Sequence, residues 1–409
     1  MTTAGHLSAT LSTRINNAPD DNQNDLNDSR ETKESLVSAG TDKIRVLCIS
    51  SHVGSLTNAR PEAEWFIGLQ RHGIQMTVMT EENSVYADRM RAAGVEVVPL
   101  NIRRKYEWRV IRKIRRTLRE SGHQIMHLFT NKAITNGIVA ATGLTVKVVT
   151  YRGQTGNIKR IDPTCYLTHL NPRIARITCV ADAVRADLVA NGVSPNKLVT
   201  IYKGHDLSWY NNIEAEDLGK LGVPEDAFAI ALVANNRPRK GVPVLIESSR
   251  YLPADSHIHF LLVGNGMATE KISARIAASP LADHFHLIGY RDNVLTLVAA
   301  CQASVLPATK REGLPRTILE SMGLGVVPVV TKTGGSPELV VDGESGYVVE
   351  PGDPRGLAHA MQRLADDPDA ARAMGARARE RLAEHFNVAQ GVEALVRLYQ
   401  ELASVKVTA

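Results

Sequence analysis

The stretch Glu312-Gly-Leu-Pro-Arg-Thr-Ile-Leu-Glu320 places two carboxylates around a predicted helix start. Pro315 is favoured at the first helical position, because the N–H it lacks would have no partner there. Glu312 should then lie in the preceding turn and Glu320 between one and two turns into the helix. First-turn N–H groups favour a phosphate, and carboxylates accept hydrogen bonds from sugar hydroxyls. Taken alone, such a motif is more often an acidic turn before an ordinary amphipathic helix. Together with the loops described below, the stretch predicts a site for a nucleoside diphosphate sugar.

A basic turn, residues 237–241, follows an apolar run that we predict to be a strand. Open α/β folds bind ligands at the carboxyl edge of the sheet, where this turn would lie. We expect Lys240 and Arg237 to hold a diphosphate and to stabilise the charge that it gathers as the glycosidic bond breaks, without a metal. Arg239 could simply face water, and a solvated basic surface is the open alternative for the whole turn.

Three further loops occur at the ends of predicted strands, at residues 289–292, 306–308 and 333–338. Tyr290 or Arg291 could pack on a base, and the turn at Gly334 and Gly335 should expose backbone N–H groups toward phosphate or sugar. Each loop alone could be only a tight turn, because Gly and Pro are common in all turns. Their shared position after successive strands predicts that together they outline a cleft.

Apolar, β-branched runs alternate with helical patterns from Ile44 onward, which indicates βαβ units and parallel sheets. Strands are expected at residues 44–49, 75–79, 94–99, 124–129, 146–150, 174–179 and 198–202, and then at 228–234, 258–263, 284–288, 303–306 and 326–330. The pattern restarts after a polar segment, so we predict an α/β fold of two doubly wound domains. The expected divisions are a disordered polar tail at 1–42, domains at 43–207 and 208–386, and a helix at 387–409.

Residues 235–350 resemble the donor half of the family-4 retaining glycosyltransferases of the GT-B fold, above all through EGLPRTILESMGLGVVPVVTKTGGSPELVVDGESGYVV. A weaker likeness extends from residue 44 to about residue 399. The resemblance is to the bacterial cell-surface polysaccharide or lipopolysaccharide type. It implies two Rossmann-like domains that face each other across a cleft, with the nucleotide sugar on the C-terminal domain. It also implies a final helix that crosses back to the N-terminal domain.

The resemblance also implies roles for individual residues. Glu320 would bind the ribose hydroxyls, Glu312 the donor sugar and Lys240 the diphosphate, while the amides of Gly313 and Leu314 would bind sugar or phosphate. No cofactor and no metal are expected beyond the nucleoside diphosphate sugar as co-substrate.

Two positions depart from the family pattern. Many members carry an Arg where this chain has Asn235, so Arg237 would supply that charge from a shifted position. The family often places a His where Arg152 stands, and an Arg cannot act as a general base, although it can hold an anionic or hydroxyl-rich acceptor. Activity does not require that His, because the departing phosphate oxygen can accept the proton of the acceptor.

The acceptor side is expected in the first domain. Gly54 and His52 belong to the loop after the first strand, where the family usually has a Gly-rich loop, and Arg152 follows a later strand. His127 lies toward the end of the strand at 124–129. For the two histidines the alternatives are an incidental loop residue and a hydrogen-bonded core residue.

Residues 102–119 predict a basic amphipathic helix. Trp108, Ile111, Ile114 and Leu118 have the spacing of a core-facing stripe. The opposite surface should carry Arg109, Arg112, Lys113, Arg115, Arg116 and Arg119. That surface could be merely solvated or could attach to anionic lipid. No recognition module supports a nucleic-acid partner.

A hydrophobic fraction of 44% is normal for a globular protein and allows a substantial core. The four cysteines have neither zinc-ligand nor disulfide spacing, and the single D-x-D string, Asp367 to Asp369, is better explained as a helix break. No signal segment and no run of about 18–20 apolar residues occurs. We therefore expect a cytoplasmic protein, with peripheral attachment to the cytoplasmic face of the inner membrane if the basic helix binds lipid.

Together these patterns predict a retaining, metal-independent glycosyltransferase of the hexosyltransferase type. It would move a sugar from a nucleoside diphosphate to a glycan or lipid-linked acceptor. Two alternatives stay open: a nucleotide-sugar epimerase on the same fold, and a catalytically degenerate sugar-nucleotide-binding protein.

Overall fold

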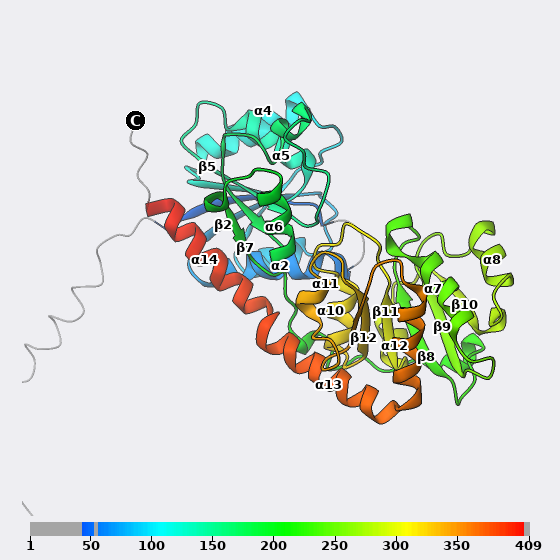
Figure 1. Ribbon diagram of the computed structural model, residues 1–409. Helices are drawn as coiled ribbons and strands as arrows, with labels where there is room; N and C mark the ends of the chain where they lie inside the picture. Colours follow the sequence, from blue (N-terminus) through cyan, green and yellow to red (C-terminus); the bar gives the residue numbers. More distant parts are fainter. Residues whose placement is uncertain (1–42, 53–55, 405–409) are drawn as a thin grey trace, which may run out of the picture. The chain divides into compact units, whose positions relative to one another are not determined.

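The computed structural model describes residues 43–52 and 56–404, and Figure 1 shows their helices and strands. The predicted tail at 1–42 and Gly54 of the expected acceptor loop lie outside the described residues.

The first sheet has seven parallel strands in the order β3-β2-β1-β4-β5-β6-β7. They are β1 (Arg45–Ile49), β2 (Gln75–Thr80), β3 (Glu96–Pro99), β4 (Ile125–Leu128), β5 (Lys147–Arg152), β6 (Ile174–Cys179) and β7 (Leu198–Thr200). Every one was predicted from its apolar run, because strands buried on both faces of a parallel sheet are almost continuously hydrophobic.

The second sheet has six parallel strands in the order β10-β9-β8-β11-β12-β13. They are β8 (Phe228–Val233), β9 (Ile258–Val263), β10 (Phe285–Gly289), β11 (Ala303–Leu306), β12 (Val327–Thr331) and β13 (Tyr347–Val349). Among the strands of the described residues only β13 was not predicted. Its apolar run is confined to Tyr347–Val349 between Gly346 and Glu350, whereas the run that predicted β7 extends over residues 198–202. The two sheets confirm the predicted α/β class of two doubly wound units. The predicted boundary at residues 207 and 208 falls between β7 and β8 and stays a prediction.

Helices connect the strands and cover the sheets. They are α2 (Leu56–Arg71), α3 (Ala87–Ala92), α4 (Trp108–Glu120), α5 (Asn131–Ala140), α6 (Asp182–Ala190), α7 (Val242–Ser248), α8 (Glu270–Ala277), α9 (Val294–Ala300), α10 (Arg316–Gly323), α11 (Ser336–Leu339), α12 (Pro354–Asp366), α13 (Pro368–His385) and α14 (Val388–Ser404). Helix α2 begins at Leu56 and contains Pro61 as its sixth residue. None of the helices in the described ranges combines the length and the apolar character needed to cross a bilayer.

The last helix, α14, packs against the helix layer of the first sheet. Val392, Leu395 and Tyr399 of α14 share a buried cluster with Trp65 and Phe66 of α2. Figure 1 shows α14, in red, beside α2. The C-terminal end of the chain is therefore part of the core that supports the first sheet.

The predicted core stripe of α4 is correct at Ile111, Ile114 and Leu118, which are buried, but wrong at Trp108. The indole is 67% exposed, and Val110 takes the fourth core position. At 3.6 residues per turn, Trp108 points about 100° away from the centre of the stripe that these four residues form. A large aromatic ring thus remains on the surface of a basic helix.

Candidate functional site

The predicted donor turn lies between β11 and α10. Helix α10 begins at Arg316, so Pro315 is its N-cap and not its first residue, one position from the prediction. Glu320 is the fifth residue of α10, and both Glu312 and Glu320 are 4% exposed. A buried carboxylate needs a cation or hydrogen-bond donors to remain charged, so each requires a partner.

A cavity of about 470 Å³ lies beside this turn. It is lined by Gly153, Val233, Ala234, Asn235, Arg237, Arg239, Lys240, Pro315, Arg316 and Thr317. Four of these residues are cationic, and they come from the turn after β8 and from the start of α10. Cations and a helix N-terminus that converge on one cavity create a setting for a polyanion.

Glu312 is the counter-charge of the basic turn. Its Oε1 lies 2.9 Å from Nζ of Lys240 and 3.8 Å from Nη1 of Arg239. Arg239 also donates to the backbone carbonyl of Arg311 at 2.6 Å, so the suggestion that it simply faces water was wrong. Arg237 lines the cavity but is exposed, and it has no ion pair among the described residues. Lys240 and Arg239, rather than Lys240 and Arg237, form the pair nearest to Glu312.

Glu320 pairs with Arg316, the cation that lines the cavity at the start of α10. Its Oε1 is 3.3 Å from Nε of Arg316, one helical turn earlier. Burial raises the pKa of Glu320, while Arg316 and Arg60 of α2 act in the opposite direction. The prediction did not include Arg316, although its place at the first turn after Pro315 was a usable signal.

The donor turn closely approaches the loop that follows β5. A Cβ on Gly313 would lie 2.0 Å from the backbone oxygen of Gly153, so no larger residue fits without backbone movement. Thr155 donates from its backbone N–H to the carbonyl of Glu312 at 3.3 Å. The tight approach of Gly313 is therefore to another loop of the chain. Leu314 is half-buried and packs against two of the hydrophobic clusters.

The two glycines of the next loop pack on the same turn. Gly334 has a positive φ of 52°, and a Cβ there would lie 2.2 Å from the carbonyl oxygen of Glu312. The backbone N–H of Gly335 donates to Gly313 at 2.7 Å. The N–H of Gly335 is therefore already bonded, and the prediction that it faces phosphate or sugar is wrong for this structure. Both glycines instead fix the position of the donor turn.

The two candidates for base contact differ. Tyr290 is 55% exposed and its hydroxyl donates to Asp292 at 2.8 Å, which leaves the ring face open. Arg291 forms an ion pair with Glu216 at 2.9 Å. Tyr290 is consequently the freer of the two for contact with a base.

Glu338 makes a connection that the sequence reasoning did not assign. Its carboxylate accepts hydrogen bonds from the backbone N–H groups of Asp182 at 2.9 Å and Ala183 at 2.8 Å, at the start of α6. The hydroxyl of Tyr202 donates to it at 2.9 Å. A carboxylate at a helix N-terminus satisfies otherwise unpaired donors, so Glu338 attaches α11 to α6. The acidic residue after the glycine turn was visible in the sequence, but its partners are far away along the chain.

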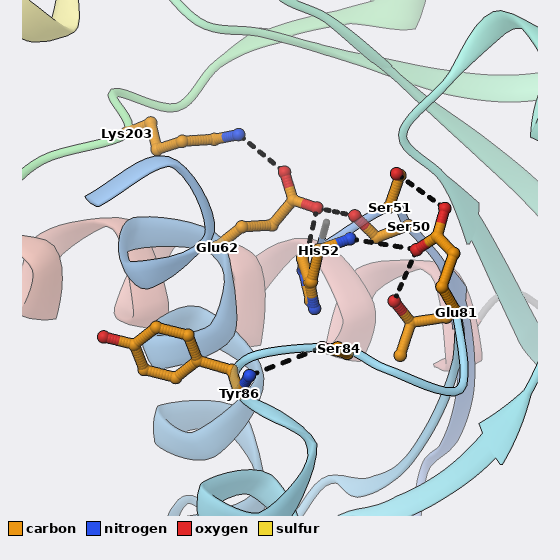
Figure 2. A network of polar contacts seen from close by, with 9 residues as sticks. Ser50, Ser51, His52, Glu62, Glu81, Ser84, Tyr86 and Lys203 are labelled. Carbon is orange, nitrogen blue, oxygen red and sulfur yellow. Dashed lines mark hydrogen bonds and ion pairs between the residues drawn. The ribbon is translucent and has the colours of Figure 1, made fainter. Parts of the chain in front are cut away.

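Figure 2 shows the polar network at the carboxyl end of β1, on the expected acceptor side. His52 is 1% exposed, and its Nε2 lies 3.4 Å from Glu62, which in turn lies 2.7 Å from Nζ of Lys203. Burial alone would raise the pKa of Glu62, but Lys203 and His52 outweigh it and lower the pKa to about 2. The backbone N–H of His52 donates to Glu81 at 3.1 Å. His52 is thus held inside a charged network and does not project into solvent.

Lys203 lies among aromatic rings. Its ammonium is 4.3 Å from the ring centroid of Tyr151, 5.6 Å from that of Trp65 and 5.9 Å from that of Phe129. Such contacts favour a cation over the ring face. The ion pair with Glu62 and these rings together join α2 to the segment that leaves β7.

The other acceptor-side candidates are also buried. His127 is fully buried, and its ring nitrogens contact Tyr399 at 2.7 Å and Thr178 at 3.0 Å. Burial lowers its pKa to about 3, so it is the hydrogen-bonded core residue and not an acceptor ligand. Arg152 is 6% exposed and donates to the carbonyl of Gly156. The guanidinium therefore shapes the loop that meets the donor turn.

The remaining predictions concern metals and thiols. All four cysteines are free and buried. Asp367 is the N-cap of α13, and Asp369 pairs with Arg372 at 2.7 Å, which agrees with the helix-break explanation of this string. Across the described residues, no group of three or more His, Cys, Asp or Glu side chains is placed to hold a metal ion.

Comparison with known proteins places this geometry in a family. Residues 214–381 match the family described as "Glycosyl transferases group 1", and residues 64–209 match "Glycosyltransferase Family 4". Among solved structures, HepE of Anabaena in complex with UDP is 18% identical, with a TM-score of 0.72 over 88% of this chain and 100% of that one. The two sheets thus have the GT-B architecture. The chain belongs to the family-4 glycosyltransferases.

The matches to curated proteins cover about half of the length of each relative. N-acetyl-alpha-D-glucosaminyl L-malate synthase of Bacillus anthracis is 29% identical over 212 residues, which are 51% of this chain and 55% of the relative. The UDP-Gal:alpha-D-GlcNAc-diphosphoundecaprenol alpha-1,3-galactosyltransferase of Escherichia coli is 26% identical over 217 residues, 51% of this chain and 56% of the relative. The chain therefore spans about half the length of the curated relatives it matches.

Proposed function

We propose that the protein is a retaining glycosyltransferase that moves a hexose from a nucleoside diphosphate sugar to a hydroxyl of a glycan or lipid-linked acceptor in cell-surface polysaccharide or lipopolysaccharide synthesis. The observation that carries the proposal is the buried Glu312 carboxylate, 2.9 Å from Lys240 at the rim of the cationic cavity. The family match does not favour an epimerase, and the E. coli relative's name describes transfer from UDP-galactose to a lipid-linked sugar.

In this proposal the diphosphate binds in the cavity among Lys240, Arg239, Arg237 and Arg316. The four cations and the two buried carboxylates together leave a net charge of about +2 in the free site, which is opposite and equal to the charge of a diphosphate diester. An uncharged donor sugar needs no further cation there.

The chemistry follows from this placement. The bond from the anomeric carbon to the diphosphate oxygen breaks, and a bond to the acceptor oxygen forms on the same face of the sugar. The departing phosphate oxygen takes the acceptor's proton, so no protein base is required. Fixed cations and the start of α10 stabilise the leaving charge, and we propose that no metal takes part. Glu312 orients the donor sugar through its hydroxyls, and Glu320 binds the ribose.

We place the acceptor near the loop after β5, because Gly153 lines the cavity and Arg152 shapes that loop. His52 acts there only through the network that holds the end of β1. A lipid-linked acceptor is consistent with a protein that works at the cytoplasmic face of the inner membrane and attaches through the basic segment 102–119. We propose no nucleic-acid partner.

The test is product analysis. The full chain is incubated with UDP-glucose or UDP-galactose and with lipid-linked or lipopolysaccharide acceptors, with and without EDTA. Mass spectrometry should show transfer of one hexose, NMR should show that the anomeric configuration of the donor is kept, and EDTA should not change the rate. Inversion of that configuration would refute the retaining mechanism. A sugar altered without any acceptor would favour an epimerase, and binding without turnover across the acceptor panel would favour a degenerate binding protein.

A further inference from the structure

The segment from β3 into the first turns of α4 presents cations and aromatic rings to solvent. Tyr106 is 47% exposed and Trp108 67% exposed. Five basic residues of this segment are also exposed: Arg103, Arg104, Lys105, Arg109 and Arg112. Within the described residues none of these five forms an ion pair with a carboxylate, and the one nearby acid, Glu107, accepts instead from the backbone N–H groups of Arg103 and Arg104. We call residues 103–112 the basic-aromatic surface.

Two further cations of α4, Lys113 and Arg115, are already bonded to backbone carbonyls. Arg115 donates to the backbone carbonyls of Ala140 at 2.9 Å and Thr142 at 2.6 Å. Lys113 donates to the carbonyl of Pro99 at 2.5 Å. The predicted basic face is therefore narrower than expected at Lys113 and Arg115. Arg116 lies 3.8 Å from Glu120 and Arg119 is exposed near the C-terminal end of α4, whereas the other exposed cations gather toward the N-terminal end.

The backbone under the basic-aromatic surface is fixed by a buried side chain. Asn136 of α5 is fully buried, and its Oδ1 accepts from the N–H of Glu107 at 2.9 Å. Its Nδ2 donates to the carbonyls of Arg104 at 3.2 Å and Lys105 at 2.9 Å. A loop whose main chain is held this firmly presents its side chains outward in a defined arrangement, which lowers the entropy lost when they bind a partner.

The combination of residues indicates which partner this surface suits. Tryptophan and tyrosine rings are favoured at the boundary between lipid headgroups and acyl chains, because each has an apolar body and a polar group. Clustered Arg and Lys residues bind anionic headgroups. Trp108, with the guanidinium of Arg112 5.9 Å from its ring, joins both features in one place.

The position of the surface agrees with this partner. Strands β3 and β5 run parallel in one sheet, so the segments that leave Pro99 and Arg152 lie at the same edge. Four strand spacings separate β3 from β5, or about 19 Å. Gly153, the first residue beyond β5, lines the proposed donor cavity. A bilayer bound at residues 103–112 would lie near the edge where an acceptor must enter.

We infer that the basic-aromatic surface docks the enzyme on an anionic bilayer, with Arg and Lys side chains at the headgroups and the rings of Tyr106 and Trp108 at the interface. This inference deepens the proposed use of a lipid-linked acceptor and rests on it. The surface would hold the acceptor-side edge of the first sheet against the membrane that contains the substrate.

The experiment is co-sedimentation of the full chain with vesicles of phosphatidylcholine alone and of phosphatidylcholine mixed with phosphatidylglycerol. The double variant Arg109→Ala/Arg112→Ala should bind the anionic vesicles about 25-fold more weakly, roughly fivefold per cation. The matched control is Lys271→Ala/Arg275→Ala, which removes two exposed cations from α8 and should not change binding. High salt should weaken wild-type binding, because it screens exposed charges.

A second pair of variants tests the aromatic contribution. Trp108→Ala should lower binding to anionic vesicles at both low and high salt, whereas Tyr251→Ala should not. Tyr251 is a close match, being 44% exposed with the guanidinium of Arg355 5.1 Å from its ring. Circular dichroism should show that all four variants keep the wild-type fold.

Equal binding to neutral and anionic vesicles would overturn the inference, as would an equal loss in the α8 control. Binding to duplex DNA but not to vesicles would also overturn it. Binding of UDP-glucose without vesicles, measured in parallel, separates this inference from the proposed function. If donor binding is normal and vesicle binding is absent, only the docking surface is refuted. If vesicles bind and no nucleoside diphosphate sugar does, the proposed function fails instead.

Discussion

Nζ of Lys240 lies 2.9 Å from Oε1 of Glu312, in a pair whose side chains are only 19% and 5% exposed. Glu312 therefore pairs with the same lysine that we propose as a ligand of the diphosphate. A diphosphate that enters the cavity must therefore compete with Glu312 for Lys240, while a donor sugar gains the carboxylate as a hydrogen-bond acceptor. The two ends of the donor should respond in opposite ways when this carboxylate is neutralised.

The first prediction follows from that competition. Glu312→Gln should tighten binding of UDP by about tenfold, because a charge-assisted contact worth about 1.5 kcal/mol no longer competes for Lys240. The same change should lower hexose transfer by about 100-fold, because the amide binds the sugar less well. Calorimetry and a transfer assay measure the two effects. Glu350→Gln, which neutralises an exposed carboxylate 3.5 Å from Lys332, is the control and should change neither quantity. Weaker UDP binding in Glu312→Gln would contradict the competition.

The second prediction separates the two arginines of the basic turn. Arg239→Ala should weaken UDP binding by about tenfold, because its guanidinium is already oriented by Glu312 and by the carbonyl of Arg311. Arg237→Ala should have a smaller effect, because that side chain is exposed and must be ordered on binding. Arg372→Ala, a surface change in α13, serves as the reference. Unaltered calorimetric affinity in Arg237→Ala would remove Arg237 from the site, and a larger loss there than in Arg239→Ala would reverse our assignment.

The third prediction concerns the contact between the donor turn and the loop after β5. Gly313→Ala should lower the free energy of unfolding by about 1–3 kcal/mol and reduce transfer, because its Cβ would lie 2.0 Å from the carbonyl oxygen of Gly153. In Gly219→Ala the nearest atom is Oδ1 of Asp217 at 3.1 Å, so a shift of a few tenths of an ångström in that side chain makes room for the new methyl group. Denaturant titration should show little change for Gly219→Ala. Equal stability of the two variants would show that the turn and the loop do not meet so closely.

The fourth prediction tests the attachment of α11 to α6. Glu338→Ala removes the acceptor for the N–H groups of Asp182 and Ala183, and should lower the free energy of unfolding by about 1–2 kcal/mol. Glu338→Gln keeps one acceptor oxygen and should recover part of that loss. Glu344→Ala, at a nearby exposed residue, is the control. A Glu338→Ala protein as stable as the control would mean that the cap contributes nothing.

The fifth prediction is a loss of stability in mild acid. Burial lowers the pKa of His127, His169 and His205 to about 3 in the folded protein, while their unfolded pKa is about 6.5. The unfolded chain therefore binds more protons between these values. The neutral, buried histidines therefore contribute fully to the free energy of unfolding above pH ~6.5. As the pH decreases, this contribution falls by up to about 1.4 kcal/mol per pH unit for each histidine. Denaturant titrations from neutral pH down to about pH 5 measure the slope. A flat profile would contradict the burial of neutral histidines, and His169→Gln should reduce the slope by the share of one group.

Local pattern was enough to predict the fold. Buried parallel strands are apolar runs, so twelve of the thirteen strands in the described residues could be located from the sequence. Strand β13 could not, because its apolar run is short and is bounded by Gly346 and Glu350. The carboxylates and cations of the donor turn could be proposed because each lies at the end of a strand or the start of a helix. Which of these side chains pair with one another could not be predicted, because the 2.9 Å contact of Lys240 with Glu312 joins residues that are distant in sequence.

The mistaken predictions have a common cause. Exposure depends on tertiary packing, which a periodic pattern constrains only approximately. Trp108 has the helical spacing of the core stripe and is nevertheless exposed. His127 lies at the end of a strand and is nevertheless buried, in contact with the hydroxyl of Tyr399 of α14. Arg239 and Arg237 are two residues apart in a basic turn, and only the fold decides which of them reaches Glu312.

The central claim is that a nucleoside diphosphate sugar binds in the cavity between the basic turn and the start of α10. The most direct test is a crystal structure of the protein with UDP-glucose. We predict density for the diphosphate among Lys240, Arg239 and Arg316, with Glu312 on the sugar hydroxyls and Glu320 on the ribose. An empty cavity, with the ligand bound elsewhere or with both carboxylates directed away from it, would contradict the claim.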